Sequence, residues 1–190
     1  MNNKYKQTEI GLIPSDWEVM LLGNISDVSS GGTPNRMISA YWDGHIPWIT
    51  TSQIDFTTII EANEFITIEG ILNSAAKIFK AGTLLMAMYG QGKTRGKIAI
   101  LGIDAATNQA CCAMIPEASI CDSQFLFYSL RNHRADFIQI ASGGAQRNLS
   151  GNLIRRFALN TPPLSRQKAI ARILGTLDDK IELNRLMNAT

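Results

Sequence analysis

A proline pair followed by a long segment without strong helix breakers divides the chain into two parts. The segment 161–164, Thr-Pro-Pro-Leu, is stiff because each proline fixes its own φ and lacks a backbone donor. The segment 165–188 starts with serine, a good N-cap residue, and only its single glycine disfavours a helix. We therefore expect a globular domain over residues 1–161 and a helix within residues 162–190.

The predicted helix carries an apolar seam. Ile170, Leu174, Leu177 and Ile181 follow at spacings of four, three and four residues, as in one helix of a coiled coil. Docking onto another chain and folding back onto its own domain are both open for such a helix. The residues predicted to bind a partner are Leu164, Gln167, Ile170, Ile173, Leu174, Leu177 and Ile181.

Short apolar runs predict strands in the globular part. With 45% apolar and 18% charged residues, the composition is that of an ordinary soluble protein. We predict an α/β (α+β) fold, a mixed twisted β-sheet with short helices, followed by the long helix. A tail is expected over residues 1–16. The predicted strands are 17–22, 45–50, 65–68, 83–89, 97–101, 108–115 and 157–159, and the predicted helical segments are 23–28, 69–76 and 123–141.

Charge is distributed unevenly along the chain. The total is +2, but residues 1–76 carry −6, residues 77–172 carry +9 and residues 173–190 carry −1. A strongly basic middle beside an acidic flank is typical of a protein that binds a polyanion. Random scatter of surface charge is the alternative.

Two glycine-containing loops in the basic region combine cationic and amide side chains. The first spans residues 90–96 between two predicted strands, and the second spans residues 142–148. Lysine and arginine neutralise DNA phosphates, arginine can bind guanine, and glutamine or asparagine can bind adenine. The pattern favours nucleic acid, with solvated loops as the alternative.

Motifs that resemble catalytic sites do not fit their chemistry. The first loop looks like a nucleotide-binding P-loop, but Ala87 stands where a glycine is needed and a strand is predicted to follow. The segment 160–163 only partly matches the base-binding element of amino-methyltransferases. His45 and His133 have no nucleophile beside them in the sequence. We expect no catalytic residues, although phosphate transfer at the first loop is kept as a rival hypothesis.

The three cysteines favour a reducing compartment. An odd number of cysteines is unsuited to a disulfide framework, so buried thiols and a cytoplasmic location are expected. Adjacent Cys111 and Cys112 do not suit a tetrahedral zinc site. The polar N-terminus has no signal-peptide core, and no apolar run is long enough to span a membrane.

A set of motifs in a fixed order resembles the specificity subunit of type I restriction–modification enzymes. The motifs are Trp17-Glu18-Val19, Ser30-Gly31-Gly32-Thr33-Pro34, Tyr41-Trp42-Asp43-Gly44, Ile46-Pro47-Trp48-Ile49, Gly96-Lys97-Ile98-Ala99, Thr107-Asn108-Gln109-Ala110, Gly143-Gly144-Ala145-Gln146, Pro162-Pro163-Leu164-Ser165 and Leu174-Gly175-Thr176-Leu177-Asp178. The resemblance covers nearly the whole chain as one target recognition domain and its following helix.

The resemblance implies a non-catalytic chain that reads part of a bipartite site in double-stranded DNA. Its helix would pair with a second helix and dock modification subunits. Those partners would carry S-adenosylmethionine, and a restriction subunit would add ATP- and Mg-dependent cleavage; no cofactor or metal is expected in this chain. A full subunit has two recognition domains, so a half-subunit acting as a homodimer or a fragment is expected here. A two-fold dimer predicts a palindromic, interrupted site.

The loops and the resembling motifs together give the predicted DNA-binding residues. They are Gly31, Thr33, Gln91, Lys93, Thr94, Arg95, Lys97, Asn108, Gln109, Ser142, Gly143, Gln146, Arg147 and Asn148. The alternative function is that of a protein-interaction adaptor or an inactive fragment without DNA binding.

One residue departs from the family pattern. Arg166 stands where the family usually has an acidic residue before Gln167, which affects a contact at the start of the helix.

Overall fold

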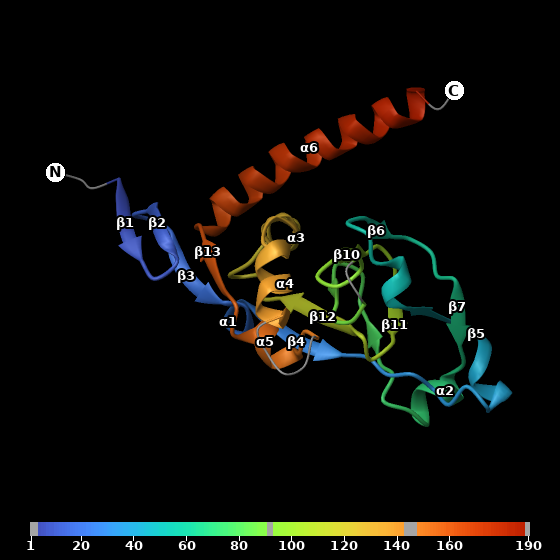
Figure 1. Cartoon of the computed structure of the whole chain (residues 1–190). Coiled ribbons are helices and arrows are strands. Elements are labelled where there is room, and N and C mark those ends of the chain that lie inside the picture. Colours follow the sequence, from blue (N-terminus) through green and yellow to red (C-terminus); the bar gives the residue numbers. More distant parts are fainter. Residues whose placement is uncertain (1–3, 91–92, 143–147, 189–190) are drawn as a thin grey trace.

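The computed structural model describes residues 4–90, 93–142 and 148–188. In these residues, short strands and helices build a globular body, and one long helix lies across it (Figure 1). Parallel and antiparallel strand pairs occur in the same sheets. This mixed arrangement confirms the predicted α+β fold.

A five-stranded sheet with the order β4-β12-β9-β10-β6 forms the centre of the body. The apolar runs in β9 and β10 are buried at every position, because both faces of the sheet are covered. Alternate side chains enter different clusters: Leu84 and Met86 face one way, and Leu85 and Ala87 face the other. The strands are β4 (Ser26–Ser30), β6 (Thr58–Ile59), β9 (Leu84–Ala87), β10 (Ile98–Leu101) and β12 (Cys111–Pro116).

Helices cover the first face of this sheet. Phe125, Leu126 and Leu130 of α3 and Phe137 of α4 are buried in the same cluster as Leu84. Asp122 caps α3 by accepting a hydrogen bond from the backbone of Phe125. These helices are α1 (Leu22–Ile25), α3 (Ser123–Asn132), α4 (Arg134–Ser142) and α5 (Gly151–Arg155).

A second sheet covers the other face. It has four strands in the order β7-β5-β11-β8, and Ile49 and Ala105 from it share a cluster with Leu85. Helix α2 (Ile68–Leu72) lies at its outer edge (Figure 1). The other elements of this part are β5 (Trp42–Ile49), β7 (Glu64–Ile66), β8 (Ile78–Phe79), β11 (Ala105–Thr107) and the short 3₁₀ helices η1 (Ser39–Tyr41) and η2 (Thr51–Gln53).

The prediction of an unstructured tail over residues 1–16 is wrong for the residues of this segment that the structure describes. Strands β1 (Tyr5–Thr8) and β2 (Gly11–Pro14) form an antiparallel hairpin, and Ile13 is buried. Strand β3 (Glu18–Leu21) pairs with β13 (Ala158–Thr161). Backbone pairing and one buried apolar side chain give this polar segment its structure.

Two other local predictions are only partly correct, because tertiary contacts override local sequence. The helical turn expected over residues 23–28 forms as α1 but ends at Ile25. Residues 26–30 pair instead with β12 as strand β4, which buries Val28. The single helix expected over 123–141 is interrupted at His133. Beyond this break, Phe137 stacks on Phe157 with ring centroids 4.2 Å apart.

Helix α6 (Leu164–Asn188) begins one residue before the predicted cap, so Ser165 lies inside its first turn. Gln167, predicted to bind a partner, is instead fully buried. Its Oε1 accepts a hydrogen bond from the backbone of Asp122, and its Nε2 donates to the carbonyls of Ile120 and Pro162, each at 2.8 Å. This side chain joins the helix to its own domain.

Charged pairs continue the junction on both sides of Gln167. Arg166, at the position that departs from the family pattern, pairs with Asp16 at 3.1 Å. Arg131 of α3 pairs with Asp178 at 3.0 Å. The last two turns of α6 are exposed at every position. The helix therefore docks onto its own domain through its first half and leaves its C-terminal part open, a combination of the two expectations.

The cysteines are buried and free, as predicted. Burial raises the pKa of each thiol, at Cys111, Cys112 and Cys121, to about 12, so all three stay protonated at neutral pH. Among the described helices, none is long and apolar enough to cross a membrane.

We predict that Gln167→Ala lowers the free energy of unfolding by about 2–4 kcal/mol, because it leaves one half-buried donor, one half-buried acceptor and one buried acceptor without their partner. Urea denaturation measures the change. Gln139→Ala, at an exposed position of α4, is the matched control and should change stability by less than about 0.5 kcal/mol. Equal stability of the two variants would contradict the proposed junction.

Candidate nucleic-acid interface

One end of the five-stranded sheet gathers most of the predicted DNA-binding segments. Neighbouring strands from β4 to β10 are antiparallel, so the chain leaves β4 and β9 and enters β12 and β10 at the same end. The loops at this end contain residues 31–33, 88–97 and 108–110. We call this region the loop end of the sheet.

Backbone hydrogen bonds join these loops to one another. The N–H of Gly32 donates to the carbonyl of Thr107 at 2.9 Å, and the N–H of Met88 donates to that of Ala110 at 2.9 Å. Leu149 donates to the carbonyl of Met88 at 3.1 Å, which brings exposed Asn148 to the same region. Segments that are far apart in the sequence therefore form one surface.

The predicted residues in the first pair of loops have different roles. A Cβ at Gly31 would lie 2.0 Å from the carbonyl oxygen of Thr107, so the close approach requires glycine. Asn108 uses its Oδ1 to accept from the backbone of Ala110 at 3.1 Å, which stabilises a turn. Thr33 donates from its hydroxyl to Oε1 of exposed Gln109. Gly31 and Asn108 thus shape the loops, whereas Thr33 and Gln109 form a polar pair at the surface.

The loop 90–96 connects antiparallel strands β9 and β10, as predicted, and a strand rather than a helix follows it. Gly90 and Gly96 have φ values of 117° and 73°, which favour glycine. The phosphate-binding geometry of a P-loop, which needs a following helix, does not form here.

The cations of this loop are not equivalent. Lys93 is exposed, and its carbonyl accepts a hydrogen bond from the Arg134 side chain at 2.9 Å. Lys97 pairs with Asp55 at 2.5 Å, and only 23% of its side chain is exposed, so much of its charge is compensated within the chain. Thr94 and Arg95 are half-buried.

Four predicted DNA-binding residues lie outside the described residues: Gln91 of the first glycine loop, and Gly143, Gln146 and Arg147 of the second. The second loop is described only at its ends. Ser142 is the last residue of α4, and its hydroxyl donates to the carbonyl of Ile138 at 2.8 Å.

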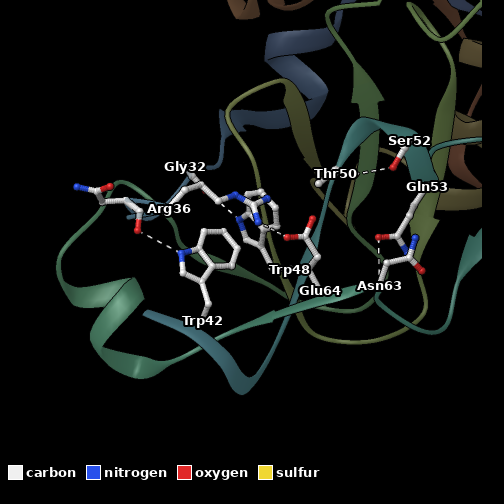
Figure 2. Close-up of polar contacts among 10 residues, drawn as sticks. Gly32, Arg36, Trp42, Trp48, Thr50, Ser52, Gln53, Asn63 and Glu64 are labelled. Atoms are coloured by element: carbon white, nitrogen blue, oxygen red, sulfur yellow. Dashed lines mark hydrogen bonds and ion pairs between the residues drawn. The ribbon is translucent and has the colours of Figure 1, made fainter. Parts of the chain in front are cut away.

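A cluster around Arg36, which the sequence analysis missed, supports the loop that follows β4 (Figure 2). The Arg36 guanidinium carbon lies 3.8 Å from the Trp42 ring centroid and 4.9 Å from that of Trp48. Glu64 of β7 forms an ion pair with Arg36. Cation–π contacts of this kind contribute about 0.5–2 kcal/mol. The two tryptophans were recognised only as parts of motifs, and the sequence contains no local signal that joins Arg36 to Glu64.

The tryptophans of this Arg36 cluster also hold the loop backbone. Nε1 of Trp48 donates to the carbonyl of Gly32 at 3.0 Å, and Nε1 of Trp42 donates to that of Asn35 at 3.2 Å. The rings meet edge to face at 5.1 Å. Because Gly32 also bonds Thr107, the cluster fixes the loop that carries Thr33.

The predicted seam on α6 is partly exposed. Leu164, Ile170 and Leu174 are half-buried, whereas Ile173, Leu177 and Ile181 are 60%, 50% and 49% exposed. Beside the seam, a groove of about 670 Å³ lies between α6, α3 and β6. Tyr128 lines it, and burial, followed by Asp178, raises the pKa of this hydroxyl to about 12.

Residues 14–189 match the family model of the type I restriction modification DNA specificity domain. The chain belongs to this family. It is 30% identical over 190 residues to the type I restriction enzyme MjaIX specificity subunit of Methanocaldococcus jannaschii, a match that covers 97% of this chain and 43% of that protein. It is 24% identical to the EcoR124I/EcoR124II specificity subunit of Escherichia coli, with 93% and 44% covered.

Solved specificity-subunit structures share the fold. The HsdS subunit from Thermoanaerobacter tengcongensis superimposes with a TM-score of 0.70 at 16% identity, over 97% of this chain and 42% of that one. The chain therefore spans less than half the length of the relatives it matches. For this specificity-domain chain, the described residues include no group of three His, Cys, Asp or Glu side chains that could hold a metal ion.

We predict that Trp48→Phe destabilises the specificity domain by about 1–3 kcal/mol, because the buried carbonyl of Gly32 loses its side-chain donor while the aromatic volume is largely kept. Urea denaturation measures the loss. Trp17→Phe is the matched control, since the buried Nε1 of Trp17 has no hydrogen-bond partner among the described residues. A loss no larger than that of Trp17→Phe would contradict the role of this bond.

Proposed function

We propose that this chain is the non-catalytic DNA-recognition part of a type I restriction–modification enzyme. It selects the site at which partner methyltransferase and restriction subunits act. The observation that carries the proposal is the family match over residues 14–189. The gathering of cationic, amide and hydroxyl groups at the loop end of the sheet supports it. S-adenosylmethionine, ATP and Mg would belong to the partners.

The charge distribution supports the loop end as the DNA-facing region. Residues 77–172 carry a net charge of +9, and the loop end contains exposed Lys93. Each lysine that neutralises a phosphate releases counterions, which makes binding dependent on salt. Lys97 contributes less to this effect in our proposal, because Asp55 already compensates its charge.

We predict that Lys93→Ala weakens duplex binding and reduces the slope of log K against log salt by about one, as expected for one lost phosphate contact. Fluorescence anisotropy over a salt series measures both quantities. Lys6→Ala is the matched control: Lys6 is exposed, like Lys93, but it lies on β1 of the N-terminal hairpin, outside the loop end of the sheet. An unchanged slope in Lys93→Ala would remove this loop from the interface.

We further propose that residues 1–161 read DNA and that residues 162–190 bind partner subunits. The exposed seam on α6 supports this division, because Leu177 and Ile181 are half exposed although the helix is anchored at Gln167. A cytoplasmic location follows from the proposed partners and agrees with three free, buried thiols.

A second copy of α6 is the partner that we propose for the seam. The spacing of Ile170, Leu174, Leu177 and Ile181 reads the same in both directions, so an antiparallel copy would place each residue opposite another seam residue. The resulting two-fold symmetry implies a palindromic, interrupted DNA site.

We predict that Leu177→Asp abolishes self-association and binding to the modification subunit, because a carboxylate in the seam loses its water without gaining a partner. Analytical ultracentrifugation measures both interactions, and circular dichroism checks that the domain stays folded. Leu183→Asp is the matched control: Leu183 is 57% exposed but lies about 120° around the helix from Leu177. Normal complexes with Leu177→Asp would show that the seam is not the docking face.

A further inference from the structure

We propose that Gln109, held by Thr33, binds a phosphate of the DNA backbone and makes no base-specific contact. This inference rests on the proposed function and assigns one contact within it. The two side chains come from separate loops at the loop end of the sheet. Gln109 is exposed, and Thr33 is half-buried beside buried Gly32 and Pro34.

The hydrogen bond between the two side chains decides which group Gln109 offers to DNA. The Thr33 hydroxyl donates to Oε1, which fixes the plane of the amide and leaves the Nε2 donors for a ligand. Among the described residues, no partner is found for Nε2. A bidentate contact to adenine uses the oxygen and the nitrogen of the amide together. A group that offers donors fits a phosphodiester oxygen, which accepts only.

The backbone on both sides of the pair is held in place. Gly32, next to Thr33, is bonded through its N–H to Thr107 at 2.9 Å and through its carbonyl to Trp48 at 3.0 Å. Asn108, next to Gln109, is bonded through its N–H to the carbonyl of Ile49 at 3.0 Å. Thr33 and Gln109 therefore lose little conformational entropy when a ligand binds, which favours binding through only these two side chains.

Gln53 shows how a glutamine with a purely structural role differs. Its Oε1 accepts from the backbone of Asn63 at 3.4 Å (Figure 2). Its Nε2 donates to the carbonyl of Glu61 at 3.1 Å. Both ends of that amide are used by the backbone of one loop. In Gln109, only the oxygen is used, by a side chain 76 positions away.

The test compares duplex binding and the methylated sequence for the full chain and its variants. Gln109→Ala and Thr33→Val should each weaken binding by about two- to tenfold, the value of one neutral hydrogen bond. The salt slope should stay unchanged, because a neutral donor releases no counterion. Thr33→Ser keeps the hydroxyl and should bind as the wild type does. Gln124→Ala, at an exposed position of α3, is the matched control. Thermal melts check folding.

The possible results separate this inference from the function on which it rests. Unchanged affinity in Gln109→Ala would overturn the phosphate contact alone. A methylated sequence that becomes degenerate at one position would also overturn it, because Gln109 would then read a base. If the wild-type chain binds no duplex at any salt concentration, the proposed function fails, and this inference fails with it. Weaker binding with the same salt slope and the same methylated sequence would support the phosphate contact.

Discussion

The burial of the central sheet on both faces is the constraint on which the rest of the structure depends. Strands β9 and β10 are apolar at every position, so helices must cover one face and a second sheet the other. Neither face can then meet a ligand. The sheet therefore presents polar and cationic side chains through the loops at the ends of its strands, and antiparallel pairing brings several of those loops together at one end.

The sequence predicts features that depend on local spacing. The helix over residues 164–188, the strands around the loop 90–96 and the buried cysteines follow from periodicity, glycine placement and composition. Features that depend on distant contacts were missed. Arg36 and Glu64 meet only because β5 and β7 pair, and Asp55 meets Lys97 only in the folded sheet. The helical turn predicted over residues 23–28 forms only up to Ile25, and its last residues belong to strand β4, whose partner lies more than 80 residues away.

The missed contacts change the account of the candidate interface. A list of cations and amides treats Lys93 and Lys97 alike, whereas the structure leaves Lys93 exposed and pairs Lys97 with Asp55. Gln167 likewise carries the amide expected at an interface, yet it holds α6 to its own domain. This anchor fixes the direction of α6 on its own domain, while Leu177 and Ile181 of the seam stay half exposed. In the function that we propose, this arrangement sets DNA recognition and partner binding at a fixed distance from each other.

The most direct test of the central claim is to sequence the methylated positions of a genome. Cells would express the modification subunit of the same system with this chain, without it, or with its seam variant. The account predicts methylation at one defined sequence motif that appears only when the intact chain is present. The same methylated positions with and without the chain would contradict the claim that it selects where its partners act.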